Sequence, residues 1–171
     1  MILEDILEGN GSQLQTKNIK IIRKFDENLP ETFIHDEQVK FILNSILLYA
    51  ILSTPYDGGM GFLTRTINQK GAGTTEDEGK IVPFKDRRYI EILIVSTSHK
   101  DPLEQLEKPP EGKAIENENS IGLILQLIRE LIQRSQGTIE FQVDEKKTRT
   151  IFILRLPCEI RRVVYYEPIK L

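Results

Sequence analysis

Apolar residues recur at helical spacing in two segments of the chain. After Asp36 they follow one another at intervals of three and four residues, which is the pattern of a helix with one buried face. Asp36 suits the N-cap position, and Pro55 disfavours a helical conformation at the residue before it. The second segment has the same periodicity and stops at Gly137, where a positive φ costs little. The pattern predicts helices over residues 36–53 and 120–135.

Strand-like patterns lie between and after these segments. Residues 89–96 form a nearly continuous apolar run, which is typical of a central strand in a covered sheet. Alternating apolar and polar residues predict further strands over 18–25, 60–67, 138–143 and 149–156, and weaker signals mark 80–84 and 163–166. The order strand, helix, strands, helix, two strands predicts an α/β fold in which the helices cover one face of a mixed sheet. Such a fold is a two-layer α/β sandwich.

The remaining segments before residue 120 are shorter or less regular. Residues 1–17 place apolar side chains at helical spacing ahead of two glycines, which predicts a short lead-in helix. Residues 68–79 are rich in Gly, Thr, Glu and Asp, and residues 98–119 hold prolines and many charges. We expect residues 68–79 and 98–118 to be the most mobile parts of the chain.

The composition is that of one ordinary globular domain. The chain has 171 residues, a net charge of −3 and no apolar run near the ~20 residues that a membrane helix needs. These values give no reason to expect a nucleic-acid partner or a membrane contact. Cys158 is the only cysteine, which excludes an intrachain disulfide and a cysteine metal cluster and fits a reducing, cytoplasmic compartment.

Few residues are candidates for metal or nucleophile chemistry. His35 and His99 are the only histidines, so a zinc site of the usual kind is not expected. Residues 96–98 place hydroxyl groups next to His99, but sequence neighbours at a strand end rarely form a nucleophile and its base. The Gly-Ala-Gly run at 71–73 lacks the lysine of a phosphate-binding loop. We therefore assign no catalytic residue and no metal ligand.

The second helical segment and the strands after it resemble the last third of the ATP-binding domain of sensor histidine kinases. In that family a Gly-x-Gly-Leu segment opens a helix, a glycine pair closes it, and two strands end in Leu-Pro. Here Gly122 stands at the first glycine and Ile124 at the second. Gly137 stands at the closing pair, and Pro157 stands at the end of the last strand.

The resemblance covers about residues 18–157. It leaves residues 1–17 as a lead-in helix or linker and residues 158–171 as a C-terminal extension. Residues 100–118 have the length and position of the lid that closes over ATP in that family. The resemblance implies a Bergerat-type ATPase fold, with helices on one face of the sheet.

The first predicted helix resembles the family's asparagine-containing helix, which ends in a similar Thr-Pro stop. In this comparison Ser45 stands at the family's first asparagine, and Tyr49 stands at the second, which holds the magnesium ion. A register shifted by one residue brings Asn44 onto the first asparagine and Leu48 onto the second. Neither a tyrosine nor a leucine acts as a hard oxygen ligand as an asparagine carbonyl does. In both registers the resemblance implies that the metal ligand is missing.

The strand over residues 89–96 resembles the one that leads into the family's Asp-x-Gly motif. Thr97 stands at the aspartate that accepts a hydrogen bond from adenine, and His99 stands at the glycine that lets the backbone approach the base. Thr97 can accept one hydrogen bond but carries no charge, and His99 adds a side chain where the family has none. Ile124 would likewise crowd the turn whose amides cradle phosphate.

An intact scaffold with altered nucleotide positions indicates a degenerate, pseudokinase-like signalling module of the bacterial two-component type. We expect no cofactor and a protein partner, namely dimerisation or phosphoacceptor helices, another kinase or a response regulator. The alternative is an active but divergent kinase domain that binds Mg-ATP and phosphorylates histidine or serine. His35, followed by Asp36 and Glu37, superficially resembles a phosphoacceptor box, but it lies at a predicted turn and lacks the proline of such a box.

Overall fold

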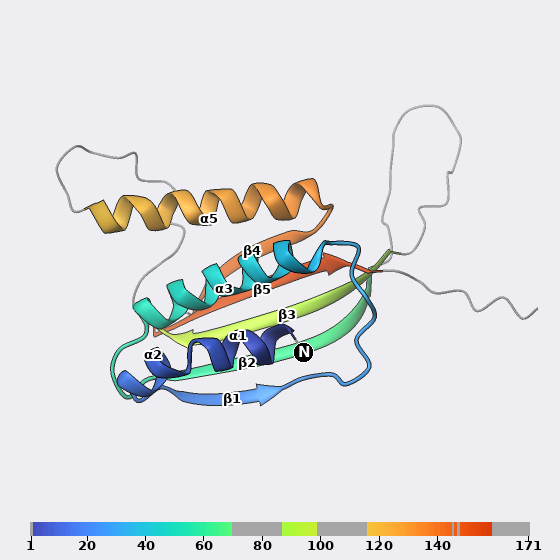
Figure 1. The fold of residues 1–171 in the computed structure, drawn as a ribbon. Helices are drawn as coiled ribbons and strands as arrows, with labels where there is room; N and C mark the ends of the chain where they lie inside the picture. The colour runs from blue at the N-terminus through green and yellow to red at the C-terminus, as the bar shows by residue number, and fades with distance from the viewer. Residues whose placement is uncertain (1, 70–86, 99–115, 145, 147, 159–171) are drawn as a thin grey trace, which may run out of the picture.

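Five strands form one mixed sheet in the order β1-β2-β3-β5-β4 (Figure 1). The strands are β1 (Lys20–Lys24), β2 (Gly59–Gln69), β3 (Arg87–Thr97), β4 (Thr138–Val143) and β5 (Arg149–Pro157). β1 lies parallel to β2, and the other neighbouring strands are antiparallel. The five strong strand predictions are confirmed, and β3 has a neighbour on each side, as its apolar run predicts.

The computed structural model describes residues 2–69, 87–98, 116–144, 146 and 148–158. The weaker strand predictions at 80–84 and 163–166 lie outside these residues. His99 and most of the two segments that we expected to be mobile also lie outside them.

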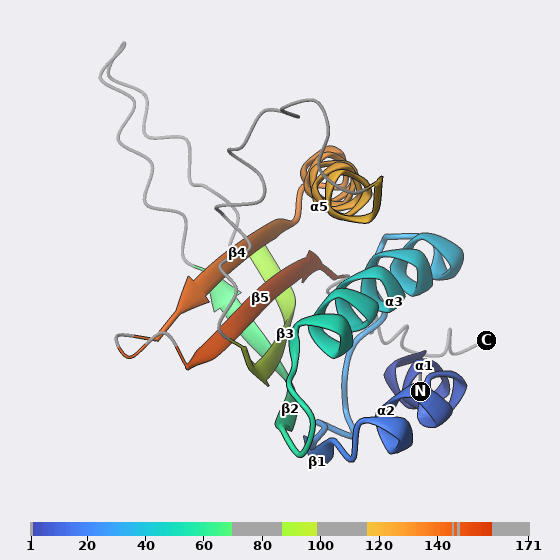
Figure 2. The same ribbon diagram turned by 90° about the vertical axis from the view of Figure 1, so that its left-hand side faces the viewer.

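The helices gather on one face of the sheet (Figure 2). They are α1 (Ile2–Gly9), α2 (Gly11–Thr16), α3 (Asp36–Ser53) and α5 (Glu116–Arg134). Within the described ranges, the opposite face of the sheet carries no helix (Figure 2). The chain therefore has the predicted two-layer α/β architecture, and α3 has the predicted bounds. Its N-cap residue is His35, however, and Asp36, which we expected at the N-cap, is the first helical residue.

Helix α5 begins at Glu116, earlier than the predicted start at residue 120. The residues in between are polar and show no helical periodicity, so hydrophobic pattern alone does not mark them as helical.

The end of α5 differs from the prediction in the residue that takes the left-handed conformation. Gln136 has a φ of 59°, whereas the prediction placed the positive φ at Gly137. The amide of Gly137 donates to the carbonyl of Ile132 at 2.9 Å, which closes the helix end. Gly137 is needed for another reason, since a Cβ there would lie 2.6 Å from the carbonyl oxygen of Arg155. The glycine therefore permits the close approach of the helix end to β5.

One hydrophobic core lies between the helices and the covered sheet face. Its members on β3 alternate along the strand, as Ile92 and Ile94 do. Helices α1, α3 and α5 each contribute fully buried side chains to this core, for example Leu7, Ile46 and Ile128 respectively. The predicted lead-in segment thus packs into the same core as the rest of the described chain.

Candidate functional site

Helix α3 carries the residue that the sequence comparison places at the magnesium position. Tyr49 is buried, with 4% of its surface exposed. Its ring meets the ring of Phe152 on β5 edge to face, with 5.7 Å between the centroids. Phe152 meets Phe141 on β4 in the same way at 5.6 Å. Such aromatic contacts add stability beyond the burial of each ring. Tyr49 is therefore part of the hydrophobic core between α3 and the sheet.

Asn44 and Ser45 lie on the same helix and are half-buried. The Nδ2 of Asn10 donates to the Oδ1 of Asn44 at 2.9 Å and to the carbonyl of Ile6 at 2.8 Å. Asn44 thus connects α3 to the segment that follows α1. In the shifted register, the residue at the family's first asparagine therefore has a structural contact with the lead-in helices.

At the end of β3, the side chain that faces the helices is not the one that the sequence predicted. Successive side chains of a strand point to opposite faces, and Ser96 faces the core with 1% of its surface exposed. Thr97 therefore lies on the other face, where its Oγ1 accepts from the amide of Gly59 at 3.2 Å. Ser96 pairs in register with Thr150 on β5, which is also buried. The polar pair on the helix side of this strand end is thus Ser96 and Thr150.

Sequence reasoning missed this pair. The alternation of Ile92 and Ile94 continues to Ser96, so that residue could have been assigned to the helix side. Thr150 could not have been placed beside Ser96 from the sequence, because its position depends on the pairing of β5 with β3. The Oγ of Ser96 forms no hydrogen bond with any residue that the structure describes.

Gly122 and Ile124 lie inside α5 and not at its N-terminus. The helix begins at Glu116, and only about the first four amides of an α-helix lack an acceptor within the helix. The amides of Gly122 and Ile124 therefore belong to the helical ladder and cannot cradle phosphate. Ile124 is 39% exposed, and its neighbours Leu123 and Leu127 are 66% and 45% exposed. This part of α5 presents apolar side chains in place of free amides.

The predicted site residues that the structure describes therefore divide between the two faces of the sheet. The positions on α3 and α5 lie in the helix layer (Figure 2). Strand alternation places Thr97 on the opposite side, because its neighbour Ser96 faces the core. In the part of the chain that the structure describes, no group of three or more His, Cys, Asp or Glu side chains could hold a metal ion. None of the described helices is long and apolar enough to cross a membrane.

Solved structures of histidine kinases share this arrangement. A nucleotide-free form of the catalytic domain of histidine kinase ThkA has a TM-score of 0.65 at 14% identity, over 92% of this chain and 92% of that chain. The mycobacterial sensor histidine kinase MprB gives 0.63 at 12% identity, over 92% and 93%. ThkA in complex with the response regulator TrrA gives 0.61 at 15% identity, over 92% and 40%.

No protein-family model matches the chain, and neither does any curated protein. The likeness therefore rests on structure, and at these low sequence identities it establishes a shared fold alone. It spans nearly the whole length of both this chain and the ThkA catalytic domain. This chain has the fold of the catalytic domains of sensor histidine kinases.

Proposed function

We propose that this chain is a histidine kinase-like signalling module that acts through protein contacts and does not bind Mg-ATP. The observation that carries the proposal is the burial of Tyr49 against Phe152 at the position of the magnesium ligand. A magnesium ligand must present an oxygen lone pair to the ion. The Tyr49 ring instead packs in the core, and moving it outward would leave a cavity between α3 and β5.

The early start of α5 is a second, independent support. It places the amides of Gly122 and Ile124 within the helical ladder, where they have carbonyl acceptors. The same stretch exposes Leu123, Ile124 and Leu127. Exposed apolar residues that gather on one helix are typical of protein contact surfaces. A helix face of this kind fits an apolar groove or another amphipathic helix.

A protein partner therefore suits this surface better than a nucleotide. ThkA has been seen in complex with the response regulator TrrA, and a response regulator is one candidate partner for this chain. Dimerisation or phosphoacceptor helices and another kinase are the other candidates. Each of these places the chain in a cytoplasmic two-component signalling assembly.

Titration calorimetry with Mg-ATP tests the loss of nucleotide binding. We expect no binding heat at nucleotide concentrations up to about 1 mM, and no change in Tm. A ligand present at ~100 times its Kd would add ~2.7 kcal/mol of stability, which is easily seen in a melt. A nucleotide-binding histidine kinase catalytic domain in the same buffer is the positive control. A micromolar Kd for the unmodified chain would contradict the proposal.

One observation favours the alternative of an active, divergent kinase. The buried Oγ of Ser96 lies beside Thr150 in register and forms no hydrogen bond with another described residue. A buried polar group without a partner is costly, and an amino group of a bound base would relieve that cost. Micromolar Mg-ATP binding that weakens in Ser96→Ala would support this alternative.

A further inference from the structure

The sheet face opposite the helices, called the open face below, has an apolar centre. The register of β3 and β5 places Leu93 beside Ile153, and Val95 beside Ile151. All four lie on the open face, because their neighbours in sequence face the core. Ile153 is 9% exposed, and the other three are half-buried among surrounding side chains. No helix of the described residues covers them (Figure 2).

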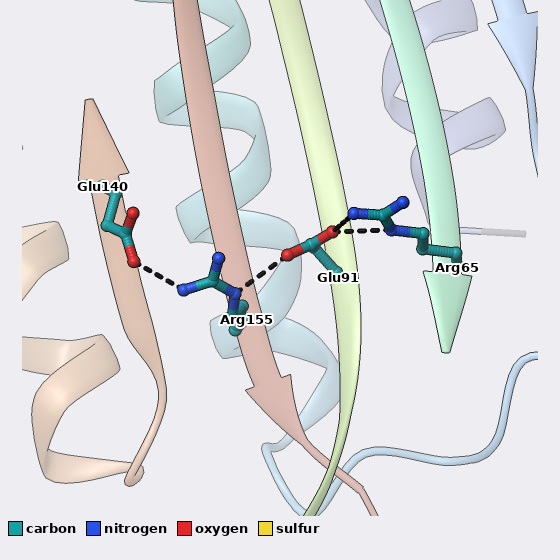
Figure 3. Close-up of polar contacts among 4 residues, drawn as sticks. All are labelled: Arg65, Glu91, Glu140 and Arg155. Atoms are coloured by element: carbon teal, nitrogen blue, oxygen red, sulfur yellow. Dashed lines mark hydrogen bonds and ion pairs between the residues drawn. The ribbon is translucent and has the colours of Figure 1, made fainter. Parts of the chain in front are cut away.

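A row of charges crosses the same face beside this apolar centre (Figure 3). The Nε of Arg65 on β2 donates to the Oε1 of Glu91 on β3 at 2.7 Å. The Nε of Arg155 on β5 donates to the Oε2 of Glu91 at 2.9 Å, and its Nη1 donates to the Oε1 of Glu140 on β4 at 2.5 Å. The charges alternate in sign from β2 to β4, so the row as a whole is neutral.

This pattern is complementary to itself. Consider two copies whose open faces meet and which are related by a two-fold axis parallel to the strands, midway between β3 and β5. The rotation places β3 of one copy over β5 of the other and leaves the position of every residue along the strand direction unchanged. Each β3 residue of one copy then lies opposite its own register partner on β5 of the other copy. The facing pairs are Leu93 with Ile153, Val95 with Ile151, and Glu91 with Arg155.

We propose that two copies of this chain associate through the open face about this axis. Apolar residues then face apolar residues, and a carboxylate faces a guanidinium, as an isologous contact requires. The arrangement corresponds to aligned packing of two sheets, in which the strand directions lie within about 30° of each other.

The size of the open face sets the expected affinity. With strands about 4.8 Å apart and a rise of about 3.3 Å per residue, the described face measures on the order of 500 Å². A standard stable interface buries about 800 Å² on each partner. We therefore expect a weak dimer, with a Kd on the order of 10 μM.

Sedimentation equilibrium of the full chain at increasing concentration tests the association. We expect the apparent mass to rise from that of a monomer to that of a dimer. Val95→Lys and Ile151→Glu each place an unpaired charge in the contact and should raise the Kd at least about 100-fold. Ile22→Lys is the matched control. Ile22 lies on the open face of β1 and is 74% exposed, but in this arrangement β1 extends beyond the edge of the other sheet. The control should leave the Kd unchanged.

A mixture of the two variants tests the pairing itself. The lysine of Val95→Lys in one copy then faces the glutamate of Ile151→Glu in the other, and the second pair remains unmodified. We expect a heterodimer that is tighter than either variant's homodimer, with circular dichroism showing that both variants are folded. Three results would overturn the proposal. They are an unmodified chain that stays monomeric up to about 0.5 mM, an equal effect of Ile22→Lys and Val95→Lys, and a mixture that does not associate.

Discussion

The ring of Tyr49 fills space between α3 and β5 that a shorter side chain would leave empty. Tyr49→Asn, which restores the family's residue, should therefore lower the free energy of unfolding by about 3 kcal/mol, through a cavity and a lost edge-to-face contact. The matched control is Leu52→Asn on the same helix, where the side chain is 59% exposed. It should cost less than about 1 kcal/mol. Urea unfolding measures both variants, and equal losses would show that Tyr49 is not a core residue.

Individual positions at this site were predictable only in part. The chemical unsuitability of Tyr49 as a ligand follows from its type alone. The contact of Tyr49 with Phe152 cannot be predicted from residue type, because residues so far apart in sequence meet only once α3 packs over β5. Thr97 was assigned by motif spacing, although strand alternation from Ile94 points to Ser96 as the residue on the helix side.

Helix α3 is anchored at its C-terminus by a residue of the lead-in segment. The Nζ of Lys17 donates to the carbonyls of Ile51 at 2.8 Å, Leu52 at 3.1 Å and Thr54 at 2.8 Å. The last carbonyls of a helix lack partners within the helix, and a cation there also opposes the helix dipole. Lys17→Met keeps the apolar stem but removes the donor, so we expect a loss of about 1–2 kcal/mol. Thermal unfolding measures it, with Lys20→Met on the exposed strand β1 as control. Equal Tm values for the two variants would contradict this role.

The end of α5 gives a pair of opposite expectations at adjacent residues. Gln136→Gly should raise the free energy of unfolding by about 0.5–1 kcal/mol, because glycine takes a left-handed φ without steric cost. Gly137→Ala should lower it by about 2 kcal/mol, because the new Cβ would meet the carbonyl oxygen of Arg155. Denaturant midpoints measure both changes. Stabilisation by Gly137→Ala would refute the close approach.

The bounds of an element were predictable where its ends carry local signals. Asp36 and Pro55 mark the two ends of α3, and both bounds were predicted correctly, although His35 and not Asp36 occupies the N-cap position. The first turn of α5 lies in a polar stretch without periodicity, and its start was predicted too late. Because α5 begins early, the backbone amide of Gly122 lies within the helix and cannot contact a phosphate. An error of a few residues at the end of an element therefore changes the chemistry assigned to a site.

At the scale of the whole molecule, the sheet has one face buried under helices and one open face. The element order was enough to predict the two layers, because amphipathic helices must cover the apolar side of a sheet. The charge row from Arg65 to Glu140 was not predictable. It requires four strands to be in register at once. Of the three pairings involved, only that of β4 with β5 joins strands that lie a few residues apart in the sequence.

Glu91 lies at the middle of that row and couples the stability of the sheet to pH. Burial of its carboxyl group opposes ionisation, but hydrogen bonds from Arg155 and Arg65 outweigh this effect and lower its pKa below the ordinary value of 4.5. A lowered folded pKa means that the unfolded chain takes up the proton first as pH falls. The ionised form therefore stabilises the fold at all pH values above 4.5. That contribution is lost as the pH falls through the lowered pKa of the folded state.

Glu91→Gln removes this contribution and leaves the two arginines without their shared carboxylate. At pH 7 we expect the free energy of unfolding to fall by about 3 kcal/mol, since the side chain of Glu91 is only 4% exposed. The difference from the unmodified chain should shrink as the pH falls below 4.5, where the wild-type carboxylate also becomes protonated. Glu140→Gln, at the exposed end of the row, is the control and should cost less than about 1 kcal/mol. Urea unfolding at one fixed protein concentration, from neutral to acid pH, measures both variants. A difference for Glu91→Gln that stays constant over this range would show that the ionised carboxylate does not hold the strands together.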